Sequence, residues 1–155
     1  MPLAEEPLDC WKTSPRFMPK QKRIDASALI VAALAAQRRA VAPYSRFKVG
    51  AALLTASGEI ITGANVESAS YGLSCCAERI ALFKALTDGS CDFRAVAVVS
   101  RGGVTPCGAC RQLLIEYAKD AVLFVADSHK PAAIRRFRVR DLLPAAFTDL
   151  PPDPS

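Results

Sequence analysis

The chain is poor in histidine and has no long hydrophobic run. His129 is its only histidine, and its longest uncharged apolar stretch, residues 26–36, has eleven residues. A membrane-spanning helix needs about 18 or more, so the sequence predicts none. Arg38 and Arg39 follow this stretch after Gln37, where a secretion signal would have small residues. We therefore interpret it as a helix packed within a folded domain.

The excess of positive charge is small, and the hydrophobic content is high. Twenty Lys and Arg against 15 Asp and Glu give a net charge of +5, which permits acidic partners without requiring them. Hydrophobic residues make up 51% of 155, enough for a single core, which excludes wholesale disorder. Proline spacing predicts an irregular N-terminal arm at residues 1–23, one domain at 24–149 and a disordered tail at 150–155.

Six cysteines would suit a disulfide framework, but their placement favours a metal site. Cys75 and Cys76 are adjacent, and Cys107 and Cys110 form a C-x-x-C pair. Disulfide-stapled domains are small and poor in core residues, unlike this chain. The arrangement indicates a reducing compartment, and we expect the protein to be cytoplasmic.

Hydrophobic patterning predicts the element order α-β-β-α-β-α-β-β. The expected helices run from residue 25 or 27 to about 40, from about 76 to 88, and from about 107 to 118. The expected strands are 47–55, 59–65, 94–100, 121–126 and a short one near 136–139, before a final helical turn. Ser57-Gly58 is typical of a hairpin turn, and helix-linked strands favour parallel pairing. We expect a three-layer α/β/α domain with a mixed five-stranded sheet.

Two short segments carry the chemistry: Cys76-Ala77-Glu78 and Pro106-Cys107-Gly108-Ala109-Cys110. Cys107 and Cys110 share one side of a helical turn, and Cys76 can join them if it lies at a helix entry. Three thiolates with an open fourth position and a nearby glutamate are typical of a catalytic zinc, one per chain. A closed site with Cys75 or Cys91 as fourth ligand remains an alternative. The pattern matches the three-cysteine form of the zinc nucleobase deaminase signature.

Over residues 25–148 the chain resembles the small homotetrameric cytidine deaminases. The resemblance rests on segments 44–53, Asn65-Val66-Glu67, Cys76-Ala77-Glu78-Arg79, 106–112 and 141–147. It implies that three cysteines bind zinc and that Glu78 shuttles protons. It further implies that Phe47 packs beside the pyrimidine and that Asn65 and Glu67 bind the ribose hydroxyls. Arg79 would bind the zinc thiolates, and Phe147 would reach the site from a neighbouring subunit.

Without the resemblance, several of these residues have ordinary interpretations. Asn65 and Glu67 would be polar groups of a turn, Phe47 a core residue and Arg79 a surface arginine. Tyr71, Cys75 and Cys91 are interpreted as structural.

The sequence therefore predicts a zinc-dependent enzyme of pyrimidine salvage. It would deaminate free cytidine and 2′-deoxycytidine to uridine and 2′-deoxyuridine, releasing ammonia. We expect a small-molecule nucleoside substrate, a homotetramer, and neither nucleic acid polymer nor membrane as partner.

Three alternatives remain at this point. A deaminase of a blasticidin S-type antibiotic would not need Asn65 and Glu67. A polynucleotide deaminase would use the arginines of segment 135–140 as a binding strip. A silent zinc-stabilised interaction module would leave Glu78 without a role.

Overall fold

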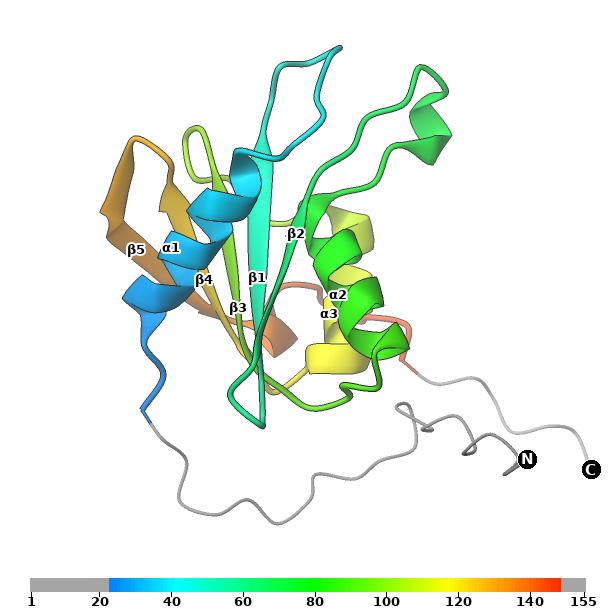
Figure 1. Cartoon of the computed structure of the whole chain (residues 1–155). Coiled ribbons are helices and arrows are strands. Elements are labelled where there is room, and N and C mark those ends of the chain that lie inside the picture. The colour runs from blue at the N-terminus through cyan, green and yellow to red at the C-terminus, as the bar shows by residue number, and fades with distance from the viewer. Residues whose placement is uncertain (1–22, 149–155) are drawn as a thin grey trace, which may run out of the picture.

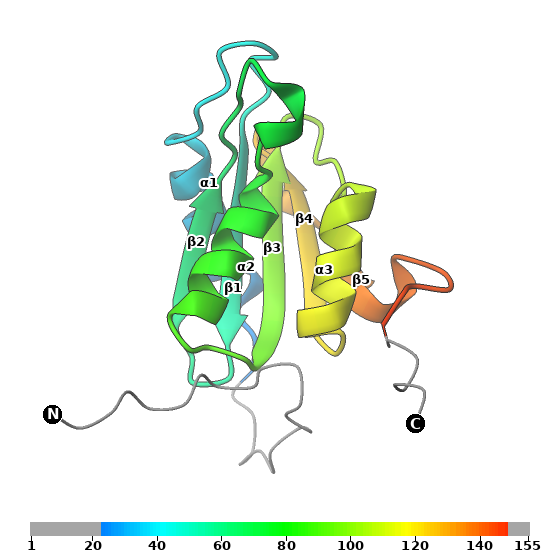
Figure 2. The ribbon, with the colours of Figure 1, turned by 90° about the vertical axis from the view of Figure 1, so that its right-hand side faces the viewer.

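A mixed five-stranded sheet in the order β2-β1-β3-β4-β5 forms the middle layer of the computed structural model, which describes residues 23–148. Its strands are β1 (Val49–Thr55), β2 (Ile60–Ala64), β3 (Phe93–Ser100), β4 (Val122–Asp127) and β5 (Lys130–Arg138). Helix α1 (Ala26–Gln37) covers one face of the sheet (Figure 1). Helices α2 (Ala77–Thr87) and α3 (Gly108–Ala118) lie side by side on the other face (Figure 2). The predicted three-layer fold is confirmed.

The pairing of the strands is more antiparallel than the sequence indicated. Strands β3 and β4, which α3 connects, are the parallel pair, whereas β1 pairs antiparallel with both β2 and β3. Helix α2 also links two strands, but β1 lies between them, so they do not pair. Strand β5 returns antiparallel to β4. The predicted turn at Ser57-Gly58 joins β1 to β2, with Gly58 at a φ of 94°.

The largest boundary differences from the predictions are at the end of α1 and at the start of β5. Helix α1 ends at Gln37 and not near residue 40, because the N–H groups of Arg39 and Ala40 turn back to the carbonyls of Ala36 and Gln37. Strand β5 begins six residues before the predicted strand; as an exposed edge strand it lacks an alternating pattern. Short 3-10 helices, η1 (Tyr71–Leu73) and η2 (Val139–Asp141), complete the structure, and only the second was expected.

The sheet separates two apolar clusters, because successive side chains of a strand point to opposite faces. Leu53, Val96 and Val98 pack beneath α2 and α3, and Ala97 and Val99 pack beneath α1. Both clusters consist of side chains that are almost fully buried. The core thus fixes each helix against the sheet.

Helix α2 approaches β2 at a glycine. A Cβ on Gly63 would lie 2.4 Å from the carbonyl oxygen of Ala77 and 2.5 Å from the amide nitrogen of Ala81. Such distances are far below van der Waals contact, so only glycine permits this packing. Gly63 therefore sets the position of the first turn of α2.

The predicted arm at residues 1–23 and the predicted tail at 150–155 lie outside the described residues, apart from residue 23. Within the described range, no helix combines the length and the apolar character needed to cross a membrane.

Candidate active site and metal centre

Strand register brings the chemistry-bearing segments to one end of the sheet. Val49 pairs with Ser100, and Gly50 pairs with Ala64, so β1 begins where β2 and β3 end. Segments 44–49, 65–68 and 104–107 meet there and, with residues from 71–79, line a cavity of about 720 Å³. We call it the site cavity. It lies beyond the carboxyl end of β3, where α/β proteins commonly bind ligands.

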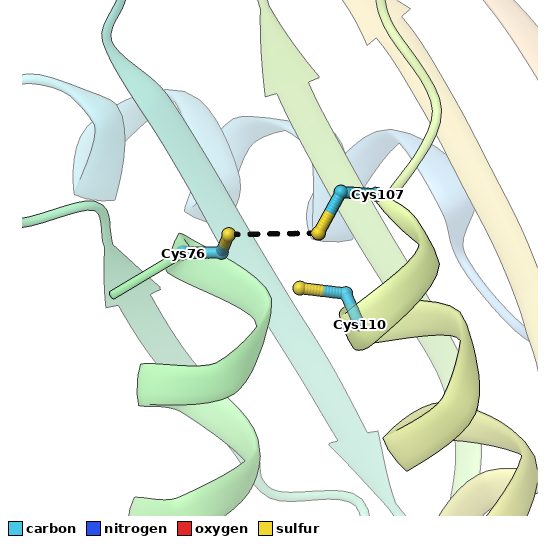
Figure 3. Close-up of side chains that lie close together, drawn as sticks. All are labelled: Cys76, Cys107 and Cys110. Carbon is cyan, nitrogen blue, oxygen red and sulfur yellow. Dashed lines mark hydrogen bonds between the residues drawn. The ribbon is translucent and has the colours of Figure 1, made fainter. Parts of the chain in front are cut away.

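Three thiols converge at the start of the two adjacent helices. Cys76 and Cys107 are the N-cap residues of α2 and α3, and Cys110 lies in the first turn of α3. Their Sγ atoms point toward one another and all lie within 4.8 Å of one another, with 3.8 Å between those of Cys76 and Cys107 (Figure 3). Tetrahedral zinc with Zn–S bonds of about 2.3 Å separates its sulfurs by about 3.8 Å. The cluster is thus suited to one zinc ion.

The charge state of the cluster also favours a bound cation. Hydrogen bonds, foremost from Cys110 and then from Arg79 and Cys107, lower the pKa of the Cys76 thiol to about 5. The hydrogen bond to Cys76 and burial in turn raise the pKa of the Cys110 thiol. Three thiolates this close repel one another, so all three ionise together only around a positive ion. Both helix N-termini, which carry partial positive charge, add to that stabilisation.

Arg79 lies against this cluster. Its NH2 group donates to the carbonyl oxygen of Ser74 at 2.9 Å and contacts Sγ of Cys76 at 3.8 Å. Its Nε is buried without a hydrogen-bond partner among the described atoms. With zinc bound, three thiolates carry one negative charge in excess of the ion, and this guanidinium balances it.

Glu78 is a buried carboxyl beside the thiol cluster. It is 6% exposed, follows Cys76 by two residues and lines the site cavity. Burial raises the pKa of its carboxyl to about 7. A cation on the thiols would lower that pKa again. A carboxyl that titrates near neutrality can both accept and donate a proton.

Asn65 lines the site cavity and fixes the segment that leads into β1. Its Oδ1 accepts from the N–H of Val49 at 2.8 Å, and its Nδ2 donates to the carbonyl oxygen of Phe47 at 2.9 Å. The amide keeps one hydrogen and one lone pair for a ligand. Phe47 also lines the cavity.

Glu67 is clamped by the loop before β1. Its Oε2 accepts from the N–H groups of Tyr44 and Ser45 at 3.0 and 3.1 Å, and its Oε1 accepts from the Ser45 hydroxyl. The Ser45 hydroxyl, together with both N–H groups, lowers the pKa of Glu67. The carboxylate is therefore ionised and fixed in orientation.

Several residues of the site have no role in the sequence prediction. Ser45 orients Glu67, and Arg111 fixes the entry to α3 by donating to the Pro106 and Leu142 carbonyls and to the Thr105 hydroxyl. The position of Arg111, directly after the C-x-x-C pair, is the signal that could have identified it. Ser45 has no such signal, because Glu67 is 22 residues away.

Of three further residues that the sequence singled out, two line the site cavity and one does not. Tyr71 and Cys75, interpreted as structural, line the site cavity, and Tyr71 is 86% exposed. Sγ of Cys75 is not part of the thiol cluster. Phe147 does not line the cavity of its own chain; it is 63% exposed, and its carbonyl accepts a hydrogen bond from Gln112.

The layers and the site together define the zinc-dependent deaminase class: three thiols at two helix N-termini, with a buried glutamate two residues after the first. Residues 23–126 match the family described as the cytidine and deoxycytidylate deaminase zinc-binding region. The chain belongs to this family, as predicted.

Relatives and solved structures agree with this assignment. A cytidine deaminase of Halalkalibacterium halodurans is 48% identical over 128 residues, which cover 81% of this chain and 96% of that protein. The crystal structure of cytidine deaminase from Burkholderia pseudomallei superposes with a TM-score of 0.76 at 48% identity, covering 80% of this chain and 100% of that one. A blasticidin-S deaminase of Bacillus cereus is 31% identical over 114 residues, covering 67% of this chain and 79% of that protein.

Proposed function

We propose that the protein is a cytidine deaminase of pyrimidine salvage. It hydrolyses free cytidine and 2′-deoxycytidine to uridine and 2′-deoxyuridine with release of ammonia. The observation that carries this proposal is the placement of buried Glu78 beside the thiol cluster, facing a cavity that also contains Asn65 and Glu67. Zinc-binding and acid–base groups thus meet sugar-binding groups in one space.

The reaction needs a nucleophile and two proton transfers. Cys76, Cys107 and Cys110 would hold the zinc ion, which would supply a Lewis acid able to lower the pKa of water toward neutrality. Glu78 accepts a proton from the attacking water and delivers it to N3 of the base as the oxygen adds to C4. Glu78 then passes the second proton to the departing amino group, which leaves as ammonia. Arg79 holds the Cys76 sulfur and keeps the cluster near electrical neutrality.

Selection of the substrate rests on the sugar. Asn65 can donate and accept, whereas ionised Glu67 only accepts, which suits a hydroxyl that must give one hydrogen bond and receive another. Phe47 provides an apolar surface for the pyrimidine. A 3′-phosphate would meet the charge of Glu67, so the same contacts exclude a polynucleotide.

A side-by-side assay tests this proposal. Cytidine should react faster than cytosine, cytidine 3′-monophosphate and a C-containing single-stranded oligonucleotide by orders of magnitude, because unpaired polar groups reject ligands that lack their partner. Glu67→Ala should reduce the ratio between the rates for cytidine and for cytosine. Comparable turnover of the oligonucleotide would refute the proposal.

The alternatives have less support. None of the arginines at 135, 136, 138 and 140 lines the site cavity itself. The blasticidin-S deaminase is a more distant relative than the cytidine deaminases reported above. A silent interaction module would not require a buried carboxyl beside the thiols.

We further propose that the enzyme is a homotetramer whose Phe147 completes the site of a neighbour. The side chains of Tyr71, Leu73 and Phe147 support this, because each is a large apolar group that is mostly exposed in the single chain and that a subunit contact could cover. The metal site needs the thiols of Cys76, Cys107 and Cys110 in their reduced form, and we therefore propose a reducing location such as the cytoplasm.

A subunit-mixing experiment tests the shared site. Phe147→Ala should impair turnover, and Glu78→Gln should abolish it. Refolding the two variants together should restore activity, because hybrid tetramers contain sites with both Glu78 and a neighbour's Phe147. Light scattering measures the assembly; activity of the mixture no higher than the average of its components would contradict the proposal.

A further inference from the structure

A second cavity of about 350 Å³ lies on the other side of segment 44–49. It is lined by Gln37, Arg38, Arg46, Lys48 and Arg101, and we call it the basic cavity. These residues come from the end of α1, the segment before β1 and the residue after β3. Ser45, Phe47 and Val49 line the site cavity, whereas Arg46 and Lys48 line the basic cavity. The two cavities therefore share one wall.

The basic cavity is rich in positive charge. Four of its five lining residues are cations, and none is an acid. Within residues 23–148 none of the four forms an ion pair, whereas Arg138 and Arg140 pair with Asp141 and Asp120. Cations gathered in a concave surface repel one another and concentrate anions there. The partial negative charge at the end of α1 opposes an anion, but it amounts to only about half a unit.

The backbone aims one of these cations into the cavity. Arg46 has a φ of 57°, a conformation that non-glycine residues adopt only when their surroundings impose it. Glu67 and Asn65 impose it by holding Ser45, Phe47 and Val49 on the opposite side. The side-chain amide of Gln37 also donates to the carbonyl of Lys48 at 2.9 Å, which joins α1 to the same segment.

We propose that the basic cavity binds the oligophosphate group of an anionic ligand. Three guanidinium groups present planar pairs of N–H donors, the geometry that matches phosphate oxygens, and the lysine adds a fourth charge. Four cations match a chain of two or three phosphates better than a single one. The group is either free inorganic oligophosphate or part of a nucleotide, and the two sources share this chemistry.

Calorimetry on the zinc-loaded protein tests the proposal. Inorganic triphosphate should bind more tightly than sulfate at equal ionic strength, and zinc content measured after the titration shows that the metal stays in place. Arg38→Gln with Arg101→Gln should weaken triphosphate binding at least about 100-fold, since hydrogen bonds to charged groups are lost at both positions. Adenosine triphosphate tested in parallel distinguishes the sources: tighter binding than triphosphate assigns a nucleotide, and equal binding assigns the phosphate chain alone.

Lys119→Gln with Arg136→Gln is the matched control, because it removes the same charge from residues that do not line the basic cavity. Its affinity for triphosphate should stay within about threefold of wild type, since distant charges are screened by salt. Equal weakening in both double variants would mean that only net charge attracts the anion, and the proposal would fail. Unchanged affinity in Arg38→Gln with Arg101→Gln would overturn it as well.

Discussion

At the scale of single residues, Cys76 combines two tasks. It is the N-cap of α2, with extended backbone at ψ 153°, and it supplies one sulfur of the cluster. The extended angle is what allows Cys76 and Glu78, two positions apart, to face the same cavity. A regular helix would point them about 160° apart around its axis. The extended backbone at the start of α2 therefore brings the thiol and the carboxyl into one site.

Replacing Cys107 by alanine should reduce zinc well below one ion per chain, because a lost ligand lowers metal affinity. Cys75→Ala is the matched control and should keep its metal, since its sulfur lies outside the cluster. Elemental analysis of both purified variants measures the outcome. Full zinc retention by the Cys107 variant, or loss from the Cys75 variant, would mean that the ligands are wrongly assigned.

Replacing Glu78 by glutamine should lower kcat by at least about 10²–10⁴, since in the proposed mechanism one group performs both proton transfers. Metal content and melting temperature should stay near wild type, because the amide keeps the size of a side chain that is only 6% exposed. Steady-state kinetics with cytidine measures the effect. Near-normal turnover would show that Glu78 is structural.

The Glu67 carboxylate should stabilise the fold down to acidic pH. Its pKa lies below the ordinary 4.5, mainly through the Ser45 hydroxyl, so its contribution is complete above 4.5 and is lost as pH falls through the lowered value. The difference in urea midpoint between wild type and Glu67→Gln should stay constant from pH 8 to pH 5 and shrink in more acidic solution. A difference that already declines near neutral pH would contradict the clamp.

At the scale of elements, the site depends on how closely α2 approaches the sheet. Gly63→Ala should destabilise the protein by about 1–3 kcal/mol, because the new methyl meets backbone atoms of α2 that can yield only if the helix moves. Zinc should also be lost faster to a chelator, since Cys76 begins that helix. Gly72→Ala, where a Cβ meets nothing within 4 Å, should be nearly neutral. Urea midpoints compare the two, and equal midpoints would refute the role of Gly63.

Elements also show what the sequence can and cannot predict. The thiol cluster was predictable because Cys107 and Cys110 lie one turn apart and helix starts leave recognisable patterns. Strand β5 was largely missed, since an exposed edge strand has no buried face to impose alternation. The clamp on Glu67 was missed too, because Tyr44 and Ser45 reach it through the folding of two loops. Periodicity reports burial, whereas loop contacts depend on the whole fold.

At the scale of the whole molecule, the metal should hold two elements together. Its ligands come from both α2 and α3, so the zinc ion would connect them. A ligand that binds only the folded state, at a free concentration about 1,000 times its Kd, raises the free energy of unfolding by about 4 kcal/mol. Removing zinc with a chelator should then lower the melting temperature by about 10–20 °C for a domain of this size. Calorimetry measures it; Cys107→Ala should show no further drop, and an unchanged wild-type melting temperature would contradict the link.

Segment 44–49 gives the molecule a property of interest to protein engineering. Arg46 and Lys48 lie in the same six-residue stretch as Ser45 and Phe47 but line a different cavity. A substitution at position 46 or 48, on the basic-cavity side, can thus shift the backbone of segment 44–49. The residues of this segment that line the site cavity keep their identity. A library confined to positions 46 and 48 would change the selectivity among nucleoside analogues without substituting any residue of the site cavity. The groups that bind zinc, transfer protons and bind the sugar would stay chemically unchanged.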